Sequence, residues 1–510
     1  MGGGRRTVVR MRAQGWAWLL AGLVLALFLA TGLQRLDAVP QVYEDEPWQA
    51  STAYELLTRG TFGSELFAGF FNMDQRYYGF MPLHPFLLAV TFKLIGVGLA
   101  QARTETVLLT AITLVLTFLL AVRLFRDAWI GALAVALLVL VRWTGLTYVQ
   151  LTGIPLVDFA RIARYDPVVP VIGLLSMHVY LSRHYLVAGV FAGLAGLAHV
   201  YGLFFVPALL LLAVWDRHAK AAVLNIAAGA VLPWLPYAAY VLQDVPDWRG
   251  QTMVYASRFE LLSPAWYVNN IAQEFHRYGP GLGPPGFNWL LRPGFWFLLI
   301  ALPLSLVALT RRALRCESAA RAIVVPALLF PILFAVFITL KLVNYTLIEL
   351  PFFALAIAWA FVTAWRMRAR LQPVLAMAAA AVVVEGGVAL STLATASITP
   401  YPTYVAEVRQ YIPSGAHVLG LHSYWLGLED FSYRSFLVPL NMADLGVPLD
   451  HALDAVDPDV VLLDARMRAY FLSVPDGAVF SAWLTNHDAR LLGEVDDPTY
   501  GQMQVYGVSR

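Results

Sequence analysis

Three adjacent carboxylic acids, Glu44, Asp45 and Glu46, are the residues of this sequence best suited to chemistry. They follow the first long apolar segment and stand between Tyr43 and Trp48. Carboxylates beside aromatic rings at a membrane surface suit proton abstraction or cation binding. The alternative is structural, because an acid at the N-cap or in the first turn of a helix interacts favourably with the helix dipole. Both interpretations stay open for Asp45.

A second acid, Asp166, lies between two arginines and a proline, Pro167. An acid followed by proline is also typical of an N-cap with proline at the first helical position. Charged residues at the mouth of a membrane helix are costly unless they are used. Arg161 and Arg164 are three positions apart, so we expect them to share a helical face that could hold a phosphate.

Further cations are expected on the same side of the membrane. Lys341 stands at the end of a later apolar segment, and the loop 243–293 mixes basic with aromatic side chains, among which Arg258 and His276 are the candidates for phosphate binding. The alternatives are a lysine that extends to the interface and an ordinary belt of interfacial aromatic residues. Acids and cations together predict a site for a sugar linked to polyprenyl phosphate. The cations would stabilise the departing phosphate, and an acid would take a proton from the acceptor.

Membrane helices must position these residues. The chain has 510 residues, of which 59% are hydrophobic and only 13% charged. Repeated apolar segments of about 18 residues or more are typical of a polytopic helical membrane protein. The apolar part, 1–397, has no glycine-rich phosphate loop and no Asp-x-Asp motif, so a water-soluble nucleotide sugar is not expected. Gly189, Gly193 and Gly196 have the spacing of helix-packing residues.

The charge pattern selects one topology. Hydropathy alone indicates twelve spans, but 80–95 carries two prolines, a histidine and a lysine, which suit an interfacial helix better than a crossing one. Without it, every inner loop is basic, as the positive-inside rule requires. The eleven predicted spans are 16–33, 103–122, 128–145, 167–182, 185–199, 201–215, 221–242, 294–310, 322–340, 346–364 and 372–393.

The last part of the chain has a different composition. Residues 401–510 contain six arginines, no lysine and fourteen acids, a net charge of −8, whereas the whole chain is +2. Alternating helix and strand patterns predict helices at 403–411, 449–456 and 478–487. Strands are expected at 417–421, 460–464, 490–495 and 502–508. We therefore predict a membrane domain, 1–397, with outer loops 34–102 and 243–293, and a small α/β domain, 398–510, on the outer side.

Four segments carry a resemblance to a known family. They are Asp45-Glu46 with Tyr54-Glu55-Leu56-Leu57; Tyr77-Tyr78-Gly79-Phe80-Met81-Pro82-Leu83-His84-Pro85; Arg164-Tyr165-Asp166-Pro167; and Lys341-Leu342-Val343-Asn344-Tyr345. In this order the chain resembles the GT-C superfamily of integral-membrane glycosyltransferases, especially the bacterial aminoarabinose–lipid A transferase and protein O-mannosyltransferase group. Each motif is weak alone, and the series of four is specific.

The resemblance implies roles for individual residues. Asp45 is implied as the general base with Glu46 in support, Asp166 as a second acid near the donor phosphate or a metal, and Lys341 as a contact of the lipid phosphate. Aminoarabinose transferases carry Glu-Lys-Pro where this chain has Phe80-Met81-Pro82, so His84, Arg164 or Lys341 would take over the phosphate contact. The only cofactor considered is a divalent metal ion, and metal dependence stays open with Asp45 and Asp166 as its ligands.

The expected partners are the lipid-linked donor, a lipid, glycan or protein acceptor, and membrane lipids, with no nucleic acid. The expected location is the inner or plasma membrane, with the site facing outward. A transporter or lipid flippase is the alternative, and it would place ionisable residues near mid-membrane and often show internal repeats. We find no repeat, and Glu385 is the one clear acid expected near mid-membrane.

Overall fold

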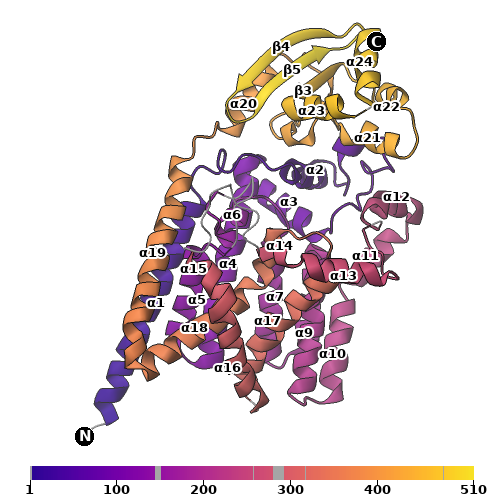
Figure 1. Cartoon of the computed structure of the whole chain (residues 1–510). Coiled ribbons are helices and arrows are strands. Elements are labelled where there is room, and N and C mark those ends of the chain that lie inside the picture. Colours follow the sequence, from indigo (N-terminus) through magenta and orange to yellow (C-terminus); the bar gives the residue numbers. More distant parts are fainter. Residues whose placement is uncertain are drawn as a thin grey trace.

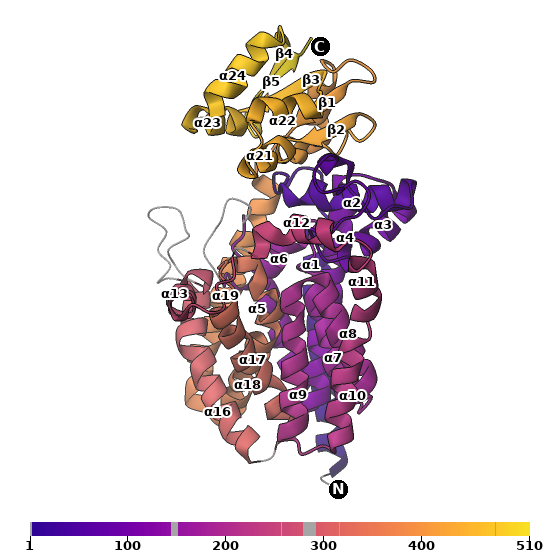
Figure 2. The same cartoon turned by 90° about the vertical axis from the view of Figure 1, so that its right-hand side faces the viewer.

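The computed structural model describes residues 3–143, 151–256, 258–278, 292–315, 317–474 and 476–509, with side chains except those of 3–13 and 254. A bundle of helices forms one part, and a small α/β unit stands at the end of the bundle away from the N-terminus (Figures 1 and 2). This arrangement confirms the predicted fold class of a polytopic helical membrane protein with a C-terminal α/β unit.

Helices occupy all eleven predicted spans. Among the residues that the structure describes, seven segments are long and apolar enough to cross a membrane. They contain α1 (Gly3–Gly32), α4 (Leu99–Phe125), α10 with α11 (Lys220–Val231, Trp234–Val241), α15 with α16 (Pro293–Trp296, Leu302–Leu314), α17 (Ser318–Phe337), α18 (Leu350–Met367) and α19 (Gln372–Thr395). The other four predicted spans are shorter apolar helices, namely α5 (Ala128–Leu140), α7 (Val168–Leu181), α8 (Tyr185–Ala198) and α9 (Phe205–Trp215).

The glycines of α8 allow a close approach to α10, as their spacing predicted. A Cβ on Gly189 would lie 2.2 Å from the carbonyl oxygen of Ile226, and one on Gly193 would lie 2.3 Å from that of Ala230. No real side chain tolerates such distances, so these two backbones pack together only because glycine lacks a Cβ.

The first outer loop contains α2 (Asp45–Thr58) and α3 (Leu83–Ile95), which lie together at the end of the bundle near the α/β unit (Figure 1). Helix α3 therefore fits the predicted interfacial segment. The remaining outer helices are α6 (Pro155–Ala160), α12 (Val245–Ala256), α13 (Pro264–Gln273) and α14 (Phe275–Tyr278).

The C-terminal unit is a five-stranded sheet with helices. Its strands are β1 (His417–Gly420), β2 (Ser432–Ser435), β3 (Val460–Asp464), β4 (Arg490–Asp497) and β5 (Gly501–Gly507), in the order β2-β1-β3-β5-β4. Strands β2, β1 and β3 are parallel, and the β4–β5 hairpin joins β3 antiparallel through β5. The helices are α20 (Tyr401–Arg409), α21 (Leu437–Asp444), α22 (Leu449–Val456), α23 (Ala465–Ser473) and α24 (Asp476–Asn486).

All seven elements predicted in this unit are present, but β2, α21 and α23 were not predicted. The four residues of β2 are too few and too polar to show alternation, and they pair with β1 only through long-range contact. Helix α23 starts where the Asp464 side chain accepts a hydrogen bond from the Met467 amide at 2.7 Å. This N-cap bond gives Asp464 a structural role at the end of β3.

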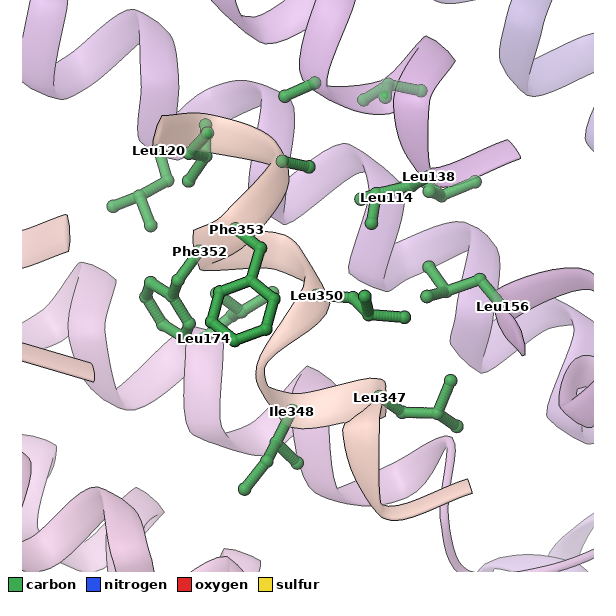
Figure 3. Close-up of a cluster of buried hydrophobic side chains, with 14 of the residues drawn as sticks. Leu114, Leu120, Leu138, Leu156, Leu174, Leu347, Ile348, Leu350, Phe352 and Phe353 are labelled. Carbon is green, nitrogen blue, oxygen red and sulfur yellow. The ribbon is translucent and has the colours of Figure 1, made fainter. Parts of the chain in front are cut away.

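Two apolar cores hold the molecule together. One fills the bundle and includes leucines of α4, α5, α6 and α7 around the start of α18 (Figure 3). The other joins the first outer loop to the sheet unit through residues such as Phe67, Leu88, Tyr404 and Trp425. A shared core fixes the α/β unit against the loop that carries Asp45.

Candidate active site

Arg164 lies between the two acids that the sequence singled out. Its Nη1 is 3.2 Å from Asp45 Oδ2, and its Nε is 3.1 Å from Asp166 Oδ2. The arginine and Asp166 are almost fully buried, whereas the Asp45 side chain keeps 19% of its surface exposed. Residues about 120 positions apart therefore meet in one ionic cluster at the mouth of the bundle, and Asp45 is the acid that a substrate can reach.

Asp45 is the first residue of α2, but its side chain does not cap that helix. The N-cap residue is Glu44, and it makes no side-chain cap hydrogen bond. Asp45 and Glu46 are first-turn acids, a position that the helix dipole favours. Burial raises the pKa of Asp45 above its ordinary value, and the guanidinium of Arg164 opposes this rise. A carboxylate with a raised pKa is a stronger proton acceptor once ionised.

Asp166 has a different role from the predicted N-cap. The N-cap residue of α7 is Pro167, and no side chain caps this helix. Instead, Asp166 Oδ1 accepts hydrogen bonds from the Tyr201 hydroxyl at 2.9 Å and from Asn344 Nδ2 at 2.8 Å. This acid is held by three elements, and it fixes Arg164 in place.

Glu46 is not placed to act on a substrate, so the prediction of a catalytic role for this residue is wrong. Its side chain is fully buried and pairs with Arg103 through both oxygens, at 2.8 Å to Nε and 2.7 Å to Nη2. The same two oxygens accept the amides of Ala163 and Tyr43. Four donors saturate the carboxylate. Its support for Asp45 is therefore structural, because it ties the first outer loop to α4 and to the 161–166 segment.

Arg161 also serves the structure rather than a ligand. Helix α6 ends at Ala160, so Arg161 and Arg164 do not share the helical face that their spacing suggested. The Arg161 side chain is fully buried, and its donors bind carbonyl oxygens at the end of α1 and in the segment after it, namely those of Thr31, Gly32, Gln34, Arg35 and Val39. No donor is left for a phosphate, so the prediction for Arg161 is wrong.

A second charged cluster surrounds Lys341. The Lys341 Nζ lies 2.8 Å from Glu274 Oε2, and the other Glu274 oxygen lies 2.6 Å from Nε of Arg277. The Arg277 guanidinium is fully buried and stands 4.5 Å from the centre of the Phe334 ring. The two clusters are joined by the chain itself, since Asn344 lies three residues after Lys341 and binds Asp166.

The two candidates from the long loop stay outside both clusters. His276 is exposed, and its neighbour in sequence, Arg277, is the buried cation. Arg258 is exposed, with its guanidinium 5.1 Å from the centre of the Tyr255 ring. A loop sequence without periodicity does not show which of two adjacent basic residues turns inward. Glu274 carried no sequence signal, because a single acid in such a loop resembles any solvated residue.

His84 is buried in contact with Gln49 of α2. Burial and, as the smaller cause, the nearby Arg164 together lower the pKa of His84 to about 3, so the ring is neutral and does not act as a cation for phosphate. Its Nε2, the Gln49 Nε2 and the Thr52 Oγ1 are buried without a hydrogen-bond partner in the part of the chain that the structure describes. Positions 45, 49 and 52 lie along one stripe of α2. Buried polar groups without a partner beside Asp45 can form hydrogen bonds with a ligand that carries several hydroxyl groups.

The acids fit a divalent metal ion poorly. Arg164 already occupies the position between Asp45 and Asp166 where a cation would stand. Within the described ranges, no group of three His, Cys, Asp or Glu side chains is arranged to hold a metal. Side chains can accept a proton from an acceptor and stabilise the charge of a phosphate.

Solved structures share this fold. ArnT from Cupriavidus metallidurans bound to undecaprenyl phosphate matches with a TM-score of 0.60 and 15% identity, covering 97% of this chain and 98% of that one. The Archaeoglobus fulgidus oligosaccharyltransferase in the apo form matches at 0.54 and 12%, covering 89% and 70%. The oligosaccharyltransferase AglB from the same organism, in complex with an inhibitory peptide and a dolichol-phosphate, matches at 0.52 and 12%, with the same coverage.

No protein-family model and no curated protein sequence matches the chain. At identities of 11 to 15%, the structural likeness establishes the fold. The fold expected from the resemblance is confirmed, because the likeness to ArnT and to the oligosaccharyltransferase spans most of the chain.

Proposed function

We propose that this protein is a glycosyltransferase that moves a sugar from a polyprenyl-phosphate-linked donor to an acceptor on the extracytoplasmic face of the inner or plasma membrane. One observation carries the proposal: a partly exposed carboxylate, Asp45, is held by Arg164 beside a second cation cluster at one end of a membrane bundle. Two neighbours of the same fold were solved with undecaprenyl phosphate and with dolichol-phosphate, which supports a lipid-phosphate ligand.

The residues divide the reaction between them. Asp45 accepts the proton of an acceptor hydroxyl or amine as that atom bonds to the sugar anomeric carbon. The bond from this carbon to the phosphate oxygen breaks, and the lipid phosphate leaves with the electron pair. Lys341 and Arg277 offset the new negative charge, and Arg164, fixed by Asp166, extends this positive field towards the reacting atoms. The unpartnered groups of Gln49, Thr52 and His84 bind sugar hydroxyls.

The orientation follows from charge. The predicted inner loops are basic and the C-terminal segment 398–510 is acidic, so we place that segment and the two clusters on the outer side. A transporter or flippase is the second candidate. We favour the transferase, because the clusters around Arg164 and Lys341 gather at one end of the bundle rather than along a path through it.

Mass spectrometry of glycans and glycolipids from cells tests the proposal. Cells with the wild-type protein should contain a glycosylated product that is absent from cells without the gene. Cells with Asp45→Asn should lack the product and accumulate the lipid-linked donor. Identical profiles in all three strains would refute the proposal, and a change in the sidedness of a lipid-linked sugar without any new product would favour the flippase.

Lys341→Met should weaken the binding of polyprenyl phosphate. To bind the phosphate, Lys341 Nζ would give up a bond to the carbonyl oxygen of Phe334 or Ile338. A hydrogen bond from a charged group contributes about 1.5–3 kcal/mol, which corresponds to roughly 10- to 150-fold in affinity. The measurement is a titration of purified protein with undecaprenyl phosphate by native mass spectrometry. Lys93→Met is the matched control, because Lys93 is an exposed lysine in the last turn of α3 at the same end of the bundle. Equal affinities of the two variants would remove Lys341 from the donor site.

A further inference from the structure

A cavity of about 370 Å³ lies between the first outer loop and the C-terminal unit. Residues 41–44 form its wall on the membrane side. The opposite wall consists of 423–424 after β1, 464–466 at the start of α23, and 498–501 in the β4–β5 turn. The volume lies within the range of small-molecule sites, which is about 300–1,000 Å³. None of the roles proposed above uses this cavity.

The cavity adjoins the ionic cluster through one residue. Tyr43 lines it, and the centre of the Tyr43 ring lies 5.0 Å from the Arg164 guanidinium carbon. The Tyr43 amide is held by Glu46 at 2.7 Å, so this wall has a fixed position. Glu44, the next lining residue, directly precedes Asp45. A molecule seated in the cavity therefore lies beside the proposed proton acceptor.

The lining is suited to hydroxyl groups and not to a phosphate. Two acids, Glu44 and Asp464, face one cation, Arg466, whereas the Lys341 cluster has two cations for one acid. Asp464 already accepts the Tyr424 hydroxyl at 2.7 Å and the Met467 amide at 2.7 Å. A carboxylate has about four acceptor positions, so two remain. The excess of acids in this cavity therefore distinguishes it from the cation-rich Lys341 cluster, which is the proposed site of the donor phosphate.

The remaining lining residues favour a sugar ring. Tyr43, Tyr424 and Tyr500 supply aromatic surface, which suits the C–H faces of sugars. The Ser423 hydroxyl is buried and has no hydrogen-bond partner within the described ranges. A buried polar group without a partner requires an explanation, and a bound hydroxyl provides one.

We propose that this cavity binds an uncharged sugar unit of the acceptor and presents the acceptor to Asp45. The inference rests on the proposed glycosyltransferase function and names the acceptor class, a glycan or glycolipid rather than a peptide. The C-terminal unit then has a defined task, since it supplies most of the wall that recognises the acceptor.

A pair of alanines on α23 offers a matched test. Ala465 and Ala469 are both exposed, but only Ala465 lines the cavity. We expect Ala465→Trp to fill the cavity and Ala469→Trp to leave it open. The full-length protein in detergent is mixed with methyl hexosides, and separately with an acetylated threonine tripeptide, and ligand binding is followed by saturation-transfer NMR. Stabilisation by undecaprenyl phosphate is measured for the same samples by thermal unfolding.

The expected result is a methyl hexoside signal for the wild type and Ala469→Trp, and its loss in Ala465→Trp, with no signal from the tripeptide. All three proteins should be stabilised equally by undecaprenyl phosphate. An undiminished signal in Ala465→Trp, no hexoside signal in the wild type, or binding of the tripeptide instead would overturn the inference. Failure of undecaprenyl phosphate to stabilise the wild type would count against the proposed function. It would not affect the inference that the cavity binds a sugar.

Discussion

Asp45→Asn should lower the rate of sugar transfer by about 10²–10⁴-fold, the usual contribution of general acid–base catalysis. Asparagine keeps the shape of the side chain but does not accept a proton. The binding of undecaprenyl phosphate should change little, because Lys341 and Arg277 are untouched. The measurement is single-turnover transfer by the purified variant, with donor binding followed in parallel.

The same substitution should not unfold the protein. Burial raises the pKa of Asp45 above its ordinary value, so the ionised acid destabilises the folded state once the pH exceeds the pKa of the unfolded chain. Removing the charge therefore costs little, and Arg164 keeps its partner Asp166. Asp74→Asn is a suitable control, because Asp74 belongs to the same outer loop and binds the exposed Gln75. An Asp45→Asn protein with wild-type transfer rates would exclude Asp45 as the base.

The raised pKa also sets the direction of the pH dependence. The base works only when ionised, so transfer should decline as the pH falls through the raised pKa of Asp45. This acid limb should lie at a higher pH than that of an ordinary aspartate, and it should be absent from the residual activity of Asp45→Asn. A limb at the ordinary aspartate pKa would indicate that another group takes the proton.

Glu46→Gln, unlike Asp45→Asn, should affect stability rather than catalysis. It should destabilise the fold by about 3–5 kcal/mol, the usual cost of removing one partner of a buried ion pair. The substitution leaves the fully buried Arg103 uncompensated and brings an amide NH₂ towards the amides of Tyr43 and Ala163. Thermal unfolding in detergent measures the loss. Activity per folded molecule should change far less than in Asp45→Asn.

Glu65→Gln provides the matched comparison for this prediction. Glu65 is an acid of the same outer loop that pairs with Arg59 and Arg434, but its side chain is about a quarter exposed. Ion pairs of this kind contribute only about 0–1 kcal/mol. If Glu46→Gln proved as stable as Glu65→Gln yet inactive, the structural role assigned to Glu46 would be wrong, and Glu46 would have a catalytic role instead.

Much of the architecture was predictable because it depends on local composition. Long apolar segments and basic loops indicated the positions of the helices in all eleven predicted spans, and two prolines led to the prediction that α3 lies at the interface. In the C-terminal unit, helices and strands with clear periodicity were predicted, and the four-residue β2 was not. The importance of Asp45, Arg164 and Asp166 was also visible, since charges are costly at the mouth of a membrane helix.

The sequence by itself singled out Asp45, Arg164, Asp166 and Lys341, and the tertiary structure decided which charged residues meet them. Asp45 and Glu46 are neighbours in the chain, but successive residues of a helix point about 100° apart, since 3.6 residues complete a turn. One therefore faces Arg164 and the other Arg103. Arg161 and Arg164 separate because α6 ends before them, and Arg277 rather than His276 turns inward. These choices depend on contacts between segments far apart in the chain, and no local pattern encodes them.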